Sequence, residues 1–187
     1  MAKIQTVFLS GPDLWFPDAH QHAGRKRALC QAAGFTGLTH LEGDLFETEN
    51  SEAMAREIYA ATLTRLRMAD AVIANLTPWR GASCDPGVAF EAGFMAARGR
   101  PVLGYMNVQD EDEAELRVRV LEYAGGEEVE DGKWRDADGC EIEDFGLPET
   151  LMLWAEARRL YVIVTPDPLG DLTGLELCLE ALRLYAD

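Results

Sequence analysis

The stretch ADAVIANLTPWRGASCDPGVAFEAGF, residues 69–94, decides the fold. Its first part, DAVIANL (70–76), is almost continuously apolar, which is typical of a strand buried on both faces of a parallel sheet. Its last part predicts a helix that begins near Asp85, because Asp is a favoured N-cap and Pro86 suits the first helical position. A buried strand that leads through a loop into a helix is the repeating unit of α/β proteins.

The same alternation extends outward along the chain in both directions. Three further runs have the apolar character of buried strands: IQTVFLS (4–10), PVLGYMN (101–107) and LYVIVTP (160–166). A fourth run, FTGLTHL (35–41), shows the same pattern more weakly. Helical patterns cover residues 20–33, 51–69, 85–99 and 171–185. We therefore predict a single domain over residues 1–187, with a doubly wound, flavodoxin-like, five-stranded parallel sheet in the order 2-1-3-4-5.

The segment from about 108 to 146 interrupts this pattern and is strongly acidic. It contains 15 Asp and Glu residues against 4 Lys and Arg, a net charge of −11 within a chain total of −16. Two Asp-Gly pairs, at Asp131 and Asp138, predict tight turns. We interpret the segment as an acidic hairpin insertion or lid. The overall charge would repel a nucleic-acid polymer, so no such partner is expected.

Composition places the protein among globular proteins of the cytoplasm. Apolar residues make up 48% of the 187 residues, enough for a sizeable core. No apolar run is long enough to span a membrane, and the N-terminus has no signal-peptide pattern. The four cysteines are widely spaced, which favours reduced thiols over disulfides or a zinc site.

Glu91 is the residue that most needs an explanation. Apolar side chains surround it in the predicted helix, and a buried carboxylate costs free energy unless it has a partner or a function. Helix side chains lean toward the N-terminus, so Glu91 points over Gly87, which has no side chain. One interpretation is an open space in front of a functional carboxylate. The other is an exposed glutamate on an ordinary surface helix.

Several other kinds of chemistry find little support in the sequence. No Walker or GxGxxG loop follows the first strand, and DADGCEIED has Cys140 and Glu141 where a calcium loop needs a ligand and a glycine. His20 and His22, near Asp18, are interpreted as solvated rather than metal-bound. Cys84 lies beside a helix start, but no strand-end histidine is apparent to activate it. We expect no metal and no cofactor.

The sequence resembles the nucleoside 2-deoxyribosyltransferase family. The resemblance is carried by VFLSGP (7–12), by the long block 69–94 and by FGLPETLML (145–153). It implies a flavodoxin-like fold, oligomers with shared active sites, and transfer of 2-deoxyribose between nucleobases through a covalent glycosyl-enzyme intermediate. The family's nucleophile is the glutamate of a D-x-G-x-x-x-E motif, which here is Glu91. The implied partners are a small deoxynucleoside and a free nucleobase.

The resemblance also implies a set of substrate-binding residues. Asp85 resembles the family aspartate that contacts substrate, Gly11 lies in the turn that approaches the ligand, and Met152 resembles a methionine donated by a neighbouring subunit. The chain departs from the family pattern at three positions, with Phe8 in place of a frequent tyrosine, Thr62 in place of Asn or Asp, and Thr150 in place of Asn. The predicted site is completed by Asp13 in the loop after the first strand and by Gly87.

Two alternatives to the transferase remain open at this level. The first is an N-hydrolase of deoxynucleosides or deoxynucleotides that uses Glu91 with water as acceptor. A phosphorylated substrate is disfavoured because the loop SGPDLWFPD (10–18) is acidic and aromatic, although Arg80 could supply a cation. The second is a nucleoside-binding module that has kept the pocket and lost turnover, which the threonines at 62 and 150 would favour.

Overall fold

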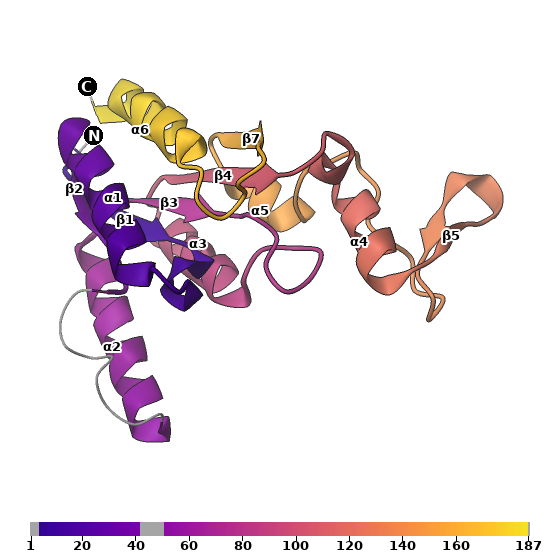
Figure 1. Cartoon of the computed structure of the whole chain (residues 1–187), viewed down its shortest axis with the longest axis horizontal. Helices are drawn as coiled ribbons and strands as arrows, with labels where there is room; N and C mark the ends of the chain where they lie inside the picture. Colours follow the sequence, from indigo (N-terminus) through magenta and orange to yellow (C-terminus); the bar gives the residue numbers. More distant parts are fainter. Residues whose placement is uncertain (1–3, 42–50, 187) are drawn as a thin grey trace.

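The computed structural model of the chain describes residues 4–41 and 51–186, and its centre is a five-stranded parallel sheet (Figure 1). The strands lie in the order β2-β1-β3-β4-β7, and every neighbouring pair is parallel. Their bounds are β1 Thr6–Ser10, β2 Thr36–Leu38, β3 Ala71–Asn75, β4 Val102–Val108 and β7 Leu160–Val164. Because β7 is the fifth strand of this sheet along the chain, the predicted order 2-1-3-4-5 is confirmed.

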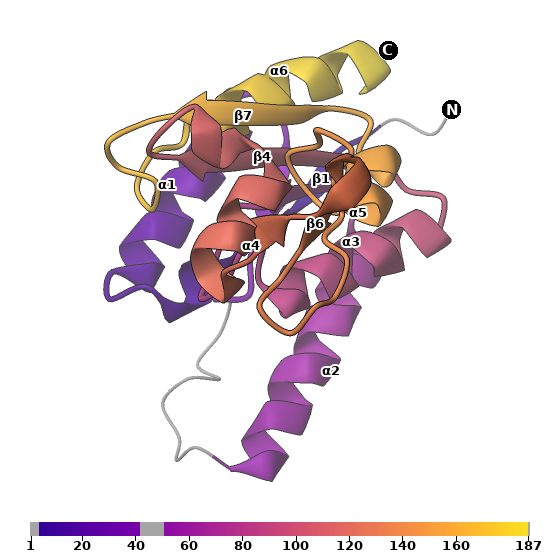
Figure 2. The same ribbon diagram turned by 90° about the vertical axis from the view of Figure 1, so that its right-hand side faces the viewer.

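Helices cover both faces of the sheet (Figure 2). Helices α1 (Ala19–Ala32) and α6 (Thr173–Ala186) pack on one face, whereas α2 (Glu52–Met68) and α3 (Pro86–Ala97) pack on the other. A short helix, α5 (Leu151–Glu156), lies beside α3. None of the helices in the described parts of the chain is long and apolar enough to cross a membrane.

Strand β1 shows how the sequence builds both layers of the core. Val7 and Leu9 belong to the cluster that includes α1 and α6, whereas Phe8 belongs to the cluster that includes α2 and α3. All three are fully or almost fully buried, as are the residues of β3. Side chains of a strand alternate between the two faces, so a strand covered by helices on both sides must be apolar throughout.

The predicted helix starts have the expected caps. The Ser51 hydroxyl accepts a hydrogen bond of 3.1 Å from the Met54 amide at the start of α2. The Asp85 carboxylate accepts one of 2.8 Å from the Gly87 amide at the start of α3. These bonds satisfy amide groups that have no partner within the first turn of a helix.

The acidic insertion lies between β4 and β7 and projects away from α1 and α2 (Figure 1, right). It contains α4 (Leu116–Ala124) and an antiparallel pair, β5 (Glu127–Glu128) and β6 (Trp134–Arg135). Gly132 and Gly139, the second residues of the two Asp-Gly pairs, have φ values of 73° and 82°. The backbone turns there in the left-handed region that glycine tolerates, so the predicted hairpin is confirmed.

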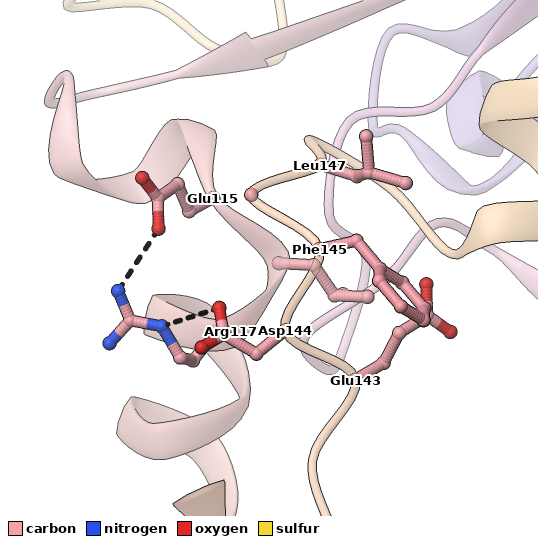
Figure 3. Close-up of a pocket in the computed structure, with 8 residues that line it drawn as sticks. Glu115, Arg117, Glu143, Asp144, Phe145 and Leu147 are labelled. Atoms are coloured by element: carbon pink, nitrogen blue, oxygen red, sulfur yellow. Dashed lines mark hydrogen bonds and ion pairs between the residues drawn. The ribbon is translucent and has the colours of Figure 1, made fainter. Parts of the chain in front are cut away.

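A charged contact inside the insertion holds its two halves together (Figure 3). The Arg117 guanidinium of α4 donates to Glu115 at 3.1 Å and to Asp144 at 2.9 Å, and it lies 4.7 Å from the centre of the Trp134 ring. This arginine therefore ties α4 to the segment that returns toward the sheet. The shallow hollow around it has no room for a ligand.

Candidate active site

The Glu91 carboxylate is buried and held from two sides. Its side chain lies in the second turn of α3, and the residue is only 6% exposed. One carboxylate oxygen, Oε2, accepts a hydrogen bond of 2.5 Å from the Ser10 hydroxyl. The other, Oε1, lies 2.6 Å from Nε2 of His40. Glu91 is therefore not the exposed glutamate of a surface helix, which was the simpler interpretation of the sequence.

Both partners lie at the carboxyl ends of adjacent strands. Ser10 is the last residue of β1, and His40 follows β2 by two residues. Because β1 and β2 are parallel neighbours, their ends reach the same edge of the sheet, where α3 begins. The Phe8 ring is fully buried and meets the His40 ring edge-on, with 5.1 Å between the centroids. Phe8 thus supports the imidazole and lies outside the cavity described below.

The hydrogen bonds leave the carboxylate able to react. An ionised carboxylate has no proton to give, so with Glu91 ionised the Ser10 hydroxyl and the His40 Nε2–H are both donors. A carboxylate has about four lone-pair positions, and these two donors occupy one on each oxygen. The remaining positions can face a ligand. The donors orient the group and compensate for part of its lost hydration.

A cavity of about 340 Å³ opens in front of Glu91. It lies between the loop after β1, the helix α2 and the start of α3. Its walls are largely apolar and aromatic, and they include two carboxylates, from Asp85 and Glu91. The lining residues are Gly11, Leu14, Trp15, His40, Ala55, Ile58, Tyr59, Thr62, Leu63, Asp85, Gly87, Val88, Phe90 and Glu91.

The cavity contains no cationic lysine or arginine among its described lining residues. Residues 42–50, EGDLFETEN, lie outside the described part of the chain, but their sequence also contains no Lys or Arg. Arg80, the one cation that the sequence suggested, stacks on Trp79 with 5.0 Å between its guanidinium carbon and the ring centre, and it does not line the cavity. The described walls therefore offer no strong site for a phosphate group.

The structure brings five of the predicted site residues around this cavity: Glu91, Asp85, Gly87, Gly11 and Thr62. Asp85 uses Oδ1 to cap α3, so its Oδ2 can contact a ligand. A Cβ atom added to Gly87 would meet only Oδ1 of Asp85, at 2.8 Å, and otherwise open space. The space predicted above Gly87 is thus present, with Asp85 on its border.

Asp13 occupies a different place from the one predicted. Its carboxylate is buried and forms an ion pair of 2.5 Å with Lys26 of α1, which is 1% exposed. Burial by itself raises the pKa of Asp13, but the charge and hydrogen bond of Lys26 hold it below the ordinary value of 3.8. A Cβ atom on Gly11 would collide with Oδ1 of Asp13. Asp13 therefore lies behind Gly11 and does not line the cavity.

Thr150 and Met152 line a separate cavity of about 430 Å³. It lies on another face of α3, next to Ala89, Ala92 and Gly93. Met152 is 74% exposed, one of the most exposed large apolar side chains in the described chain. Within one subunit neither residue contributes to the cavity in front of Glu91, so their predicted role would have to be played from a neighbouring subunit.

Cys84 is a structural thiol. Burial, and next the nearby Glu149 carboxylate, raise the pKa of Cys84 to about 12, so the thiol stays protonated. The start of the helix therefore does not activate the thiol, and a structural Cys84 was the favoured interpretation of the sequence. The backbone amide of Cys84 donates to Glu149 at 2.9 Å.

Sequence reasoning missed His40 and Ser10, and it misjudged His22. His40 is a strand-end histidine of the kind that appeared to be absent, and it serves Glu91 rather than Cys84. The available signal was its position near the end of FTGLTHL (35–41), the weakest of the predicted strands. His22 was expected to be solvated, but it is 1% exposed and packs edge-on against Phe16, and burial lowers its pKa. Within the described residues, no group of acidic, His or Cys side chains is arranged to hold a metal ion.

Together, the fold and the cavity define a flavodoxin-like α/β protein with a buried, hydrogen-bonded carboxylate at the carboxyl edge of its sheet. The family model "Nucleoside 2-deoxyribosyltransferase" matches residues 7–152. The chain therefore belongs to the nucleoside 2-deoxyribosyltransferase family.

Three individual proteins are similar to this chain in sequence or in structure. The 2-desoxiribosyltransferase from Leishmania mexicana is 25% identical and superimposes with a TM-score of 0.63, over 94% of this chain and 97% of that one. A conserved protein from Enterococcus faecalis V583, 17% identical with a TM-score of 0.51 over 97% and 99% of the two chains, shares the fold. An uncharacterized protein of Schizosaccharomyces pombe is 28% identical over 163 residues, 80% of this chain and 75% of its own length.

Proposed function

We propose that the protein is a nucleoside 2-deoxyribosyltransferase with Glu91 as its nucleophile. The observation that carries the proposal is the buried Glu91 carboxylate, held by Ser10 and His40, facing a largely apolar cavity of about 340 Å³. Membership of the family and the likeness to the Leishmania mexicana enzyme support the same activity.

The proposed reaction proceeds in two displacements at one carbon. A carboxylate oxygen of Glu91 attacks the anomeric carbon of a 2′-deoxynucleoside, and the bond from that carbon to the base nitrogen breaks. The base leaves with the electron pair and takes up a proton. A ring nitrogen of a second base then attacks the same carbon, releases the Glu91 carboxylate and gives up its proton. Asp85 lines the same cavity, and in this proposal it contacts the sugar or the base.

The cavity favours an unphosphorylated substrate. A 5′-phosphate would bring at least one further negative charge toward Asp85 and Glu91, and no described cationic lysine or arginine lines the walls to balance it. The aromatic side chains of Trp15, Tyr59 and Phe90 instead offer flat apolar surfaces on which a nucleobase can stack. We therefore assign deoxynucleosides, rather than deoxynucleotides, as the substrate class.

The decisive experiment replaces Glu91 with Gln and measures base exchange between deoxyinosine and free adenine. The amide keeps the shape of the side chain but is not a nucleophile, so we expect exchange to fall by at least about a thousandfold. Brief exposure of the wild-type protein to a 2′-fluoro-2′-deoxynucleoside, with the fluorine on the sugar, should add the sugar to the peptide that contains Glu91. Mass spectrometry of the denatured protein detects this adduct.

The products separate the transferase from its alternatives. Deoxyadenosine together with hypoxanthine supports the transferase, whereas hypoxanthine with free deoxyribose would identify a hydrolase that uses the same carboxylate. Ligand binding without any product would identify a binding module. Glu91→Gln with most of the wild-type rate would exclude Glu91 as the nucleophile, and Cys84→Ser, at a buried thiol, serves as the matched control.

A further inference from the structure

Strand β7 forms an unprotected edge of the sheet. It runs from Leu160 to Val164 with five apolar residues, LYVIV, and it pairs on one side with β4 (Figure 1). Its residues are half-buried, and Val164 is 51% exposed. Proteins usually guard an edge strand with charges, proline, a bulge or very short length. The opposite edge, β2, has only three residues, whereas β7 has five and contains no charged residue and no proline between Leu160 and Val164.

The hydrogen-bonding groups of β7 alternate between β4 and the outside. The Arg159 carbonyl accepts from the Gly104 amide at 2.8 Å, and the Thr165 amide donates to the Val108 carbonyl at 2.9 Å. In a parallel ladder this parity turns residues 161, 163 and 165 toward β4. The strand is irregular just before Leu160, where the Arg158 amide also donates to the Val102 carbonyl at 2.9 Å. The amides and carbonyls of Leu160, Val162 and Val164 therefore point away from the sheet. In the described chain, no hydrogen bond from another element reaches these three residues.

The charges that flank β7 favour one orientation of an added strand. Arg158 and Arg159 precede it, and Asp167 and Asp171 follow it. A second β7 in antiparallel orientation brings the basic end of each strand to the acidic end of the other, whereas a parallel copy places like charges together. With Val162 opposite Val162, Leu160 pairs with Val164 of the other copy, so all three outward residues find partners. The Arg158–Arg159 end of each strand then lies beside the Asp167 end of the other.

We propose that the β7 edge is a self-association surface, on which the β7 strand of a second copy pairs in antiparallel orientation centred on Val162. The arrangement has twofold symmetry and joins two five-stranded sheets into one continuous sheet. A strand pair of this length buries little area, so the association should depend on protein concentration. The surface is formed by different residues from the segment around Met152, and it leaves the cavity of Glu91 uncovered.

Hydrogen exchange tests the proposal directly. Backbone amide exchange of the peptide that contains Leu160–Val164 is compared in dilute and concentrated protein, together with sedimentation velocity. In a free edge the outward amides exchange rapidly, so pairing should slow those of Val162 and Val164 by at least about tenfold at high concentration. Equal exchange at both concentrations would overturn the proposal, even if the protein associates through another surface.

Two variants separate this surface from other interfaces. Val164→Pro removes an outward N–H without touching the bonds to β4, and proline is tolerated on an edge strand. Val164→Thr keeps the N–H and is the matched control. The concentration-dependent protection should be lost in Val164→Pro and kept in Val164→Thr. Arg159→Glu, at an exposed position, should also weaken it. Protection that survives both Val164→Pro and Arg159→Glu would exclude the proposed pairing.

Discussion

At the scale of single residues, Glu91 is held by two groups of its own chain. Ser10 and His40 each donate to one carboxylate oxygen, and the buried Phe8 ring supports the imidazole. Phe8 stands where the family often has tyrosine, so this chain lacks that hydroxyl. The two donors to Glu91 lie at the carboxyl ends of β1 and β2.

Ser10 and His40 are therefore predicted to be positioning residues for catalysis. A hydrogen bond to a charged group contributes about 1.5–3 kcal/mol, so we expect Ser10→Ala to lower kcat about ten- to a hundredfold. His40→Gln, which changes the reach of the donor, should lower kcat similarly. For Ser10→Ala the KM for a deoxynucleoside should change much less, because Ser10 does not line the cavity, whereas His40 does.

Steady-state kinetics on both single variants and on the double variant check this prediction. Because the two donors hold one carboxylate, the loss in the double variant should be smaller than the product of the single losses. Circular dichroism on each variant establishes that the fold is intact. If each single variant keeps kcat within about twofold of wild type, the two hydrogen bonds do not position Glu91 for the reaction.

At the scale of elements, a buried ion pair fastens the loop after β1 to α1. The Asp13 carboxylate lies behind Gly11, which lines the cavity. Its partner Lys26 comes from the middle of α1. Removing one member of a buried pair leaves the other charge without compensation. We therefore predict that Lys26→Met lowers the free energy of unfolding at neutral pH by about 3–5 kcal/mol.

The pair also predicts how stability changes with pH. The pKa of Asp13 in the folded protein lies below 3.8, its ordinary value. The pair therefore contributes stability above that ordinary value, and the contribution is lost as the pH falls through the lower, folded pKa. Urea unfolding of wild type and Lys26→Met, at neutral pH and near about pH 3, measures both effects. Asp13→Asn combined with Lys26→Met should recover part of the loss, and equal stability of all three proteins at neutral pH would contradict the prediction.

Glu149 connects two further elements at the site. Its buried carboxylate accepts hydrogen bonds from the Ser83 hydroxyl at 2.6 Å, the Cys84 amide at 2.9 Å and the Thr150 amide at 2.6 Å. It thereby ties the start of α5 to the loop that leads into α3. The position of Asp85, and with it the cap of the helix that carries Glu91, depends on this connection.

The main elements could be predicted from the sequence because burial leaves a local pattern. The strands β1, β3, β4 and β7 are largely apolar because helices cover both faces of the sheet. Ser51 and Asp85 mark the starts of their helices, as N-caps do. The three-residue β2 gives only a faint pattern, and α5 was not expected because six residues are too few to show helical periodicity.

The site was harder to predict because its partners meet only after folding. His40 and Glu91 are 51 positions apart, and Ser10 and Glu91 are 81 apart. No local spacing reveals such contacts. Lys26 is a similar case, since a lysine in an amphipathic helix is usually exposed, and only the ion pair with Asp13 explains its burial. Asp85, Gly87 and Glu91 could be placed together because one helix carries all three.

At the scale of the whole molecule, most of the net negative charge lies away from the cavity of Glu91. The acidic insertion carries most of the net charge, and it projects away from α1 and α2 (Figure 1). None of the described residues that line the cavity of Glu91 comes from it. The interpretation of the insertion as a lid over the site of its own subunit is therefore not supported.

The last prediction concerns whether Met152 serves the active site of a neighbour. Within its own subunit Met152 lines the other cavity of α3, and 74% of the residue is exposed. Met152→Arg should therefore spare the fold but block a neighbour's site. Glu91→Gln should be inactive by itself. Mixing the two variants places an intact Glu91 next to a wild-type Met152 from the other chain, so activity should return to about one quarter of wild type for random exchange in a twofold dimer.

Base exchange after mixing and subunit exchange measures the recovery, and mixing Glu91→Gln with itself is the control. If Met152→Arg is inactive and the mixture stays inactive although hybrid dimers are found by native mass spectrometry, Met152 acts only within its own subunit. If Met152→Arg alone keeps full activity, residue 152 serves no active site.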